Sequence, residues 1–140
     1  MAKNLEMMKE ILLIEDDYLD VESVKRALKK LNVDHRLHVA HNGVDGLAIL
    51  TGNAGVPKVL PDIILLDINM PKMNGVEFLG IIKSYYSLKK IKTFVITTSA
   101  EEYDKQAMQN LGVHGYILKP LNLTDPGSDS TLNLIEELLK

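Results

Sequence analysis

Runs of apolar residues alternate with amphipathic stretches along the whole chain. The apolar runs predict strands, and the stretches between them, in which apolar residues recur every three or four positions, predict helices. The predicted strands span residues 10–15, 35–40, 62–67, 92–98 and 114–118, and the predicted helices span about 18–31, 44–51, 75–85, 101–111 and 129–139. Such regular alternation predicts one doubly wound α/β domain, with a parallel sheet and helices on both of its faces.

The apolar positions within these elements indicate which faces are buried. Residues 11–14 leave no polar face, so the first strand is expected to be covered on both sides. Gly112 stands where a glycine would end the fourth helix, and residues 51–57 have the composition of a loop. The predicted apolar stripes are Val21, Val24, Leu28 and Leu31 in the first helix, Val76, Leu79 and Ile82 in the third, and Leu132, Ile135 and Leu139 in the last.

Composition narrows the class of protein. The 140 residues, 46% hydrophobic and 25% charged, fit one globular domain, and the absence of cysteine excludes disulfides and thiol chemistry. No apolar stretch approaches the roughly 20 residues that span a bilayer, and the first residues lack a signal-peptide core. We therefore expect a cytoplasmic protein without a membrane partner. The net charge of −3 and the pI near 5.8 argue against a nucleic-acid partner.

Polar side chains directly follow four of the predicted strands. The carboxyl ends of parallel strands share one edge of the sheet, which is where open α/β folds place their sites. Carboxylates, hydroxyls and a lysine that converge there can bind a divalent cation and a phosphoryl group, so the pattern predicts a phosphorylation site. The groups are Glu15, Asp16 and Asp17 after the first strand, Asp67 after the third, Thr97 and Thr98 after the fourth, and Lys119 after the fifth.

The acidic residues admit different roles. Asp17 stands where a helix cap is needed, and we favour that role for it. Glu15 and Asp16 are better interpreted as metal ligands, because their crowding near Asp67 would otherwise be repulsive. Asp67 can serve as a nucleophile that becomes an acyl phosphate.

The lysine and the two threonines also have two interpretations each. Lys119 is a point charge on a long stem, suited to a phosphoryl oxygen, although a lysine after a strand can also be an exposed loop residue. Thr97 and Thr98 either donate a hydrogen bond to a phosphoryl oxygen or simply suit a strand, and the sequence favours neither.

Other sites find no support in the sequence. His35, His38 and His41 are evenly spaced, but side chains alternate along a strand, so the three cannot converge on one metal and are expected at the surface or in loops. There is no glycine-rich nucleotide-binding loop after the first strand and no Gly-x-Ser-x-Gly elbow for a nucleophile.

The four groups in this order resemble the receiver (CheY-like) domain of bacterial two-component response regulators, over residues of about 9–140. The resemblance implies a flavodoxin-like fold with strand order 2-1-3-4-5 and five helices. It also implies one receiver domain over residues 1–140, with no output domain.

The resemblance assigns a role to each matching residue. It implies Asp67 as the phosphoacceptor, Thr97 rather than Thr98 as the switch hydroxyl, and Tyr116 as the switch aromatic residue. Lys119 matches the phosphate-binding lysine, and its bond to Pro120 would be cis. The implied ligands of Mg²⁺, for which Mn²⁺ can substitute, are the Asp16 and Asp67 side chains, the backbone carbonyl of Asn69, and Glu15 through water. An alternative register uses Asp16 and Asp17 as the acidic pair.

The resemblance further implies a single-domain response regulator. It would take its phosphoryl group from a sensor histidine kinase or a phosphotransfer protein and act on an unknown downstream protein. A homodimer through the fourth helix, fifth strand and fifth helix would follow the habit of many receivers. The long stretch at 51–61 and the residues 96–99 are similar to stand-alone receivers that partner phytochrome-type kinases.

Two rival functions remain at this point. A Mg²⁺-dependent phosphatase with an aspartyl nucleophile typically carries an aspartate two residues later, where this chain has Asn69, so turnover of external substrates is not expected. A pseudo-receiver would bind partners without being phosphorylated, and the presence of all key residues argues against it.

Overall fold

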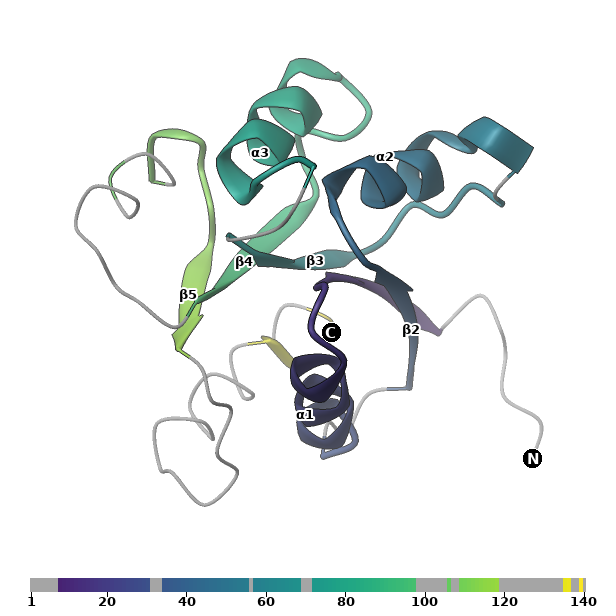
Figure 1. Cartoon of the computed structure of the whole chain (residues 1–140), viewed down its shortest axis with the longest axis vertical. Coiled ribbons are helices and arrows are strands. Elements are labelled where there is room, and N and C mark those ends of the chain that lie inside the picture. The colour runs from purple at the N-terminus through teal and green to yellow at the C-terminus, as the bar shows by residue number, and fades with distance from the viewer. Residues whose placement is uncertain are drawn as a thin grey trace.

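The computed structural model describes residues 8–30, 34–55, 57–68, 72–97, 106, 109–118, 135–136 and 139. Its sheet has five parallel strands in the order β2-β1-β3-β4-β5, as expected (Figure 1). The strands are β1 (Lys9–Ile14), β2 (His35–Ala40), β3 (Ile63–Asp67), β4 (Lys92–Thr97) and β5 (Gly115–Leu118). The strand order changes direction between β1 and β3, so the carboxyl ends of these two strands form the switch point of the sheet.

Helices cover both faces of the sheet. Helices α2 (Gly43–Thr51) and α3 (Gly75–Ser84) lie on one face, and α1 (Tyr18–Leu28) lies on the other (Figure 1). Ile135 and Leu139 of the predicted last helix are buried with the residues on the α1 side, whereas Leu132 lies outside the described residues. Most of the predicted fourth helix also lies outside them. The architecture is the predicted doubly wound, flavodoxin-like fold.

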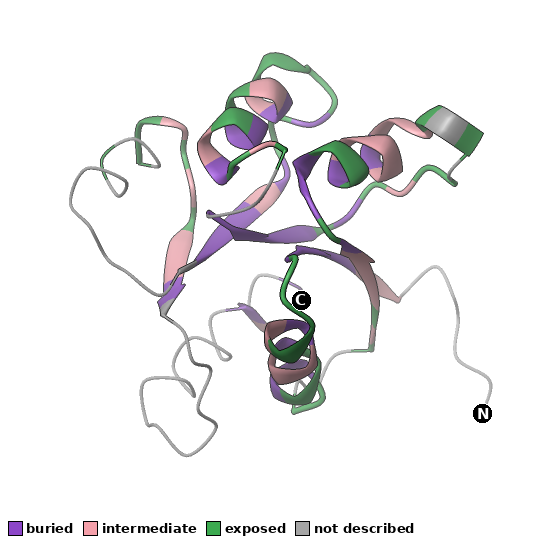
Figure 2. Ribbon diagram, in the orientation of Figure 1, coloured by how far each residue is buried: buried purple, intermediate pink, exposed green. Residues whose placement is uncertain are grey.

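The side chains of β1 alternate between two apolar cores, one on each face of the sheet. Leu12 and Ile14 pack in the core beneath α2 and α3, while Ile11 and Leu13 pack in the core with α1. All four are fully buried, so this part of β1 has no polar face, as predicted (Figure 2). The buried strands fix the positions of their carboxyl ends, where the polar residues begin.

Local signals in the sequence explain where the helices begin and end. The side chain of Asp17 accepts hydrogen bonds from the backbone N–H groups of Leu19 and Asp20, which confirms its role as the cap of α1. Asn74 and Glu77 form a capping box at the start of α3. Gly112 has φ of +77°, as expected for a glycine that ends a helix.

Three expectations need correction. Residues 51–57 are not all loop: Asn53–Gly55 form a short 3-10 helix, η2, directly after α2, which ends at Thr51 with Gly52 as its left-handed C-cap.

The buried stripe of α3 consists of Gly75, Phe78, Leu79 and Ile82, so Val76 lies at its border and is only partly buried. His38 is half-buried in β2, and its Nε2 contacts the carboxylate of Glu10, so it is not a simple surface residue.

No helix among the described residues is long and apolar enough to cross a membrane.

Candidate phosphorylation and metal site

The strand register brings the predicted acidic residues together. Ile14 of β1 pairs with Leu66 of β3, so the next residues along the two strands, Glu15 and Asp67, face each other across the edge of the sheet. Carboxylate oxygens of Glu15, Asp16 and Asp67 all lie within 4.8 Å of one another. Among the described residues this is the one group of three or more acidic or histidine side chains close enough to hold a metal ion, and no histidine belongs to it.

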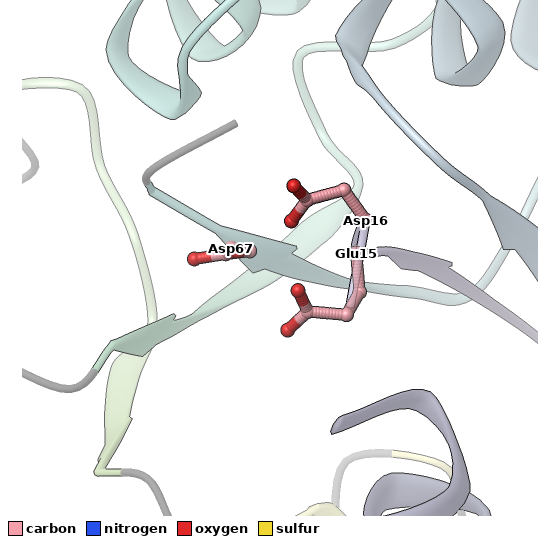
Figure 3. Close-up of side chains that lie close together, drawn as sticks. All are labelled: Glu15, Asp16 and Asp67. Atoms are coloured by element: carbon pink, nitrogen blue, oxygen red, sulfur yellow. The ribbon is translucent and has the colours of Figure 1, made fainter. Parts of the chain in front are cut away.

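The three carboxylates differ in burial. Glu15 is fully buried and Asp67 is 5% exposed, whereas Asp16 is exposed. Figure 3 shows the Glu15 and Asp16 side chains leaving the end of β1 in different directions, with Asp67 beside them at the end of β3. The site therefore has a closed side, formed by Glu15 and Asp67, and an open side at Asp16.

Two hydrogen bonds hold the end of β1 in place. The N–H of Glu15 donates to the carbonyl of Ala40 in β2 at 2.9 Å, and the N–H of Asp17 donates to the Glu15 carboxylate at 3.2 Å. The first bond fixes the Glu15 backbone and the second its carboxylate, at the strand end before α1 begins. Because Asp17 serves α1 as its cap and is absent from the acidic group, the register with Glu15 and Asp16 is favoured over Asp16 and Asp17.

Gly75 is a contributor that the sequence analysis missed. Its N–H donates to the carbonyl of Ile68 at 2.8 Å, and a Cβ added here would lie 2.9 Å from the Ile68 Cα and 3.2 Å from the Asp67 carbonyl oxygen. Only a glycine lets the start of α3 lie this close to the chain that follows Asp67. The signal was available, since Gly75 directly follows the capping residue Asn74 at the first position of the predicted helix.

Two further predicted residues lie on neighbouring strands. Thr97 is the last residue of β4, one position beyond Ile96, which pairs with Asp67. The structure describes the Thr97 backbone but not its side chain. Tyr116 pairs with Val95, is partly buried and packs against the core beneath α2 and α3. Burial raises the pKa of the Tyr116 phenol and so reinforces the neutral form that a tyrosine already has at physiological pH. Thr98, Asn69, Lys119 and Pro120 lie outside the described residues.

The donor set fits a hard divalent cation. Mg²⁺ and Mn²⁺ favour oxygen ligands, and Mg²⁺ usually takes one or two protein carboxylates while keeping several waters. Glu15, Asp16 and Asp67 supply only oxygen, and the exposure of Asp16 leaves room for water. A cation here would also relieve the repulsion among the three negative charges.

Comparisons with known proteins agree with this geometry. The response regulator receiver domain family matches residues 11–125. Response regulator Rcp1 from Synechocystis sp. is 39% identical over 120 residues, which cover 84% of this chain and 80% of Rcp1. A two-component response regulator from Legionella pneumophila has a solved structure with a TM-score of 0.80 and 37% identity, covering 92% of this chain and 98% of that one.

A second solved structure is that of the phosphorylated cyanobacterial phytochrome response regulator RcpA. It aligns with a TM-score of 0.78 and 35% identity over 94% of each chain. A third, the Mn²⁺-bound form of Rcp1, aligns with a TM-score of 0.76 and 36% identity over 92% of each chain. The chain thus belongs to the response regulator receiver domain family, whose members are signalling proteins that receive a phosphoryl group from a histidine kinase or a phosphotransfer protein.

Proposed function

We propose that Asp67 is the phosphoacceptor of this chain and that its phosphorylation controls the binding of a downstream protein. The observation that carries the proposal is the acidic group: Asp67 ends the buried strand β3, and its carboxylate lies within 4.8 Å of the carboxylate oxygens of Glu15 and Asp16. Three carboxylates held this close together, one of them nearly buried at a strand end, form the arrangement that a metal-assisted phosphoryl acceptor requires.

The transfer is a displacement at phosphorus. A carboxylate oxygen of Asp67 attacks the phosphorus of a phosphohistidine in the donor, the P–O bond forms, and the P–N bond breaks with its electron pair returning to the imidazole. Hydrolysis of the acyl phosphate later restores the carboxylate and releases phosphate. Glu15 and Asp67 shape the closed side of the site, and Lys119 is proposed to hold a phosphoryl oxygen.

The proposed metal is Mg²⁺, with Mn²⁺ able to substitute. Its ligands are the side chains of Asp16 and Asp67 and the backbone carbonyl of Asn69, with Glu15 acting through water. When bound, the cation neutralises charge on the transferring phosphoryl oxygens. The oxygen-only donor set supports this assignment, as does the Mn²⁺-bound form of the relative Rcp1.

The proposed signal passes through Thr97 and Tyr116. Phosphorylation adds strong acceptor oxygens at Asp67, and the Thr97 hydroxyl can donate a hydrogen bond to one of them. The movement of Thr97 toward the phosphoryl group would vacate space for the Tyr116 ring on the adjacent strand. A charge-assisted hydrogen bond contributes about 1.5–3 kcal/mol, so the population shift is roughly 10- to 150-fold. Thr97→Ala should accept phosphate yet show a weakened change in hydrogen exchange along β5. An undiminished response would move the coupling elsewhere, with Thr98 as the first alternative.

The proposed partners follow from the family. The donor is a sensor histidine kinase or a phosphotransfer protein, and the phytochrome response regulator RcpA among the relatives supports a kinase of the phytochrome type. We propose that residues 1–140 form one cytoplasmic receiver domain without turnover of external substrates. A homodimer through the fourth helix, β5 and the fifth helix is the proposed assembly.

The test of the phosphoacceptor is labelling with acetyl phosphate and Mg²⁺, followed by intact mass measurement. Wild type should gain the mass of one phosphoryl group and Asp67→Asn should gain none. Asp17→Asn is the matched control, because it removes a neighbouring carboxylate while asparagine still caps α1. Equal labelling of wild type and Asp67→Asn would refute the assignment, as would loss of labelling in the control alone.

A further inference from the structure

The turn between α3 and β4 is tightly built and carries its polar side chains outward. Backbone N–H groups of Leu88 and Lys89 both donate to the carbonyl of Tyr85, at 3.1 and 2.9 Å, and Ile91 donates to the carbonyl of Leu88. Leu88 and Ile91 are buried and anchor the turn to the core beneath α3. This anchoring gives the exposed residues between them a defined position (Figure 2).

Positive charge gathers on this turn. The ammonium groups of Lys89 and Lys90 lie 4.9 and 5.6 Å from the centre of the Tyr86 ring, which is 76% exposed. The Lys83 ammonium donates to the carbonyl of Lys89 at 3.1 Å. We name Lys83, Tyr85, Tyr86, Lys89 and Lys90 the basic turn.

Acidic residues do not balance this charge. Between Glu77 and Glu101 the sequence has four lysines and no acidic residue, in a chain whose net charge is −3. Within the described part of the structure, Lys83, Lys89 and Lys90 form no ion pair with a carboxylate. The nearby His114 has a pKa lowered by burial and then by Lys83 and Lys92, so it is neutral at neutral pH and the positive charge comes from the lysines.

The basic turn lies far from the phosphorylation site in the topology. Helix α3 starts beside the carboxyl end of β3 and returns the chain to the amino end of β4, so the turn stands at the opposite edge of the sheet from Asp67. A ligand on the turn would not compete with a phosphoryl donor at the acidic group. The two surfaces can therefore be occupied together.

We propose that the basic turn is a docking site for an acidic segment of a partner protein. Its few lysines match a short run of carboxylates, and the exposed tyrosine rings add flat contact surface. The negative charge of the rest of the chain disfavours the broad approach of nucleic acid or of an anionic membrane. The turn also exposes no aliphatic side chain that could enter a bilayer, because Leu88 and Ile91 are buried.

The test uses the full, unphosphorylated chain in metal-free buffer, so its outcome does not depend on the phosphorylation site. A short fluorescein-labelled polyglutamate peptide is titrated with protein and followed by anisotropy, beside an equally long polyglutamine peptide. Saturable binding to polyglutamate alone is expected, and it should weaken with salt. Lys89→Glu combined with Lys90→Glu should raise the Kd at least about tenfold, which corresponds to about 1.4 kcal/mol.

The matched control is Lys29→Glu combined with Lys30→Glu, at the exposed end of α1. It makes the same change in net charge on two adjacent lysines, and its Kd should stay within about twofold of wild type. Equal weakening in both double variants would overturn the proposal, because net charge alone would then explain binding. Absence of polyglutamate binding would also overturn it. So would tighter, Lys89- and Lys90-dependent binding to single-stranded RNA or to phosphatidylserine vesicles.

Discussion

Replacing Asp67 with asparagine should stabilise the metal-free protein while abolishing phosphorylation. The substitution removes one of three carboxylates whose oxygens lie within 4.8 Å of one another. In the unfolded chain these charges separate and are solvated, so their repulsion penalises the folded state only. Function at this site is thus expected to cost stability, as it does where like charges are held together for a ligand.

The structure sets the size of the effect. Two unit charges 4.8 Å apart repel by about 0.9 kcal/mol at the dielectric constant of water and by about 3.5 kcal/mol at an effective value of about 20. Glu15 and Asp67 are buried and Asp16 is exposed, so repulsion from Glu15 dominates. Asp67 also interacts with other groups, which offsets part of this repulsion. We expect a net gain of about 1–2 kcal/mol, or roughly 3–7 °C in Tm.

Urea unfolding followed by far-ultraviolet circular dichroism measures this effect. In buffer with EDTA, Asp67→Asn should unfold at higher urea than wild type, and the control Asp17→Asn should stay within about 0.5 kcal/mol of wild type. Mg²⁺ at about 100 times its Kd should stabilise wild type by about 2.7 kcal/mol and the variant by much less, so the order of stability should reverse. Destabilisation of Asp67→Asn in EDTA, or an equal gain in Asp17→Asn, would refute the reasoning.

Further predictions concern residues of α3, which follows the site, and the histidine His114. Asn74→Ala should cost about 1 kcal/mol in urea unfolding, because it removes the capping box of α3. Gly75→Ala should cost about 1–3 kcal/mol, since its Cβ would lie 2.9 Å from the Ile68 Cα, and metal titration should show weaker binding. Phe78→Ala should cost about 3–5 kcal/mol, because the ring is fully buried. His114 has a lowered pKa in the folded state, so wild-type stability should fall as the pH drops below about 6.5, and urea midpoints of His114→Gln should fall less.

Much of the fold was predictable because local patterns encode it. The strands were placed within one or two residues, and Asp17 was correctly interpreted as the cap of α1, because periodicity and capping depend on neighbouring residues. The errors occurred where contacts between residues distant in the sequence decide the outcome. Val76 was placed in the buried stripe of α3, but the larger Phe78 ring fills the core and Val76 lies at the border. Likewise, His38 meets Glu10 only because the strands β1 and β2 pair.

The sequence alone determined the order of the elements, the acidic, hydroxyl and lysine groups that follow the strands, and the family to which this pattern belongs. The tertiary structure decided what those groups meet. The pairing of Ile14 with Leu66 sets Asp67 against Glu15, and it buries those two while leaving Asp16 exposed. The periodicity of apolar residues shows on which face of the sheet each residue lies. It does not show how a strand is registered with another strand some 50 residues away, because the packing of the whole sheet selects that register.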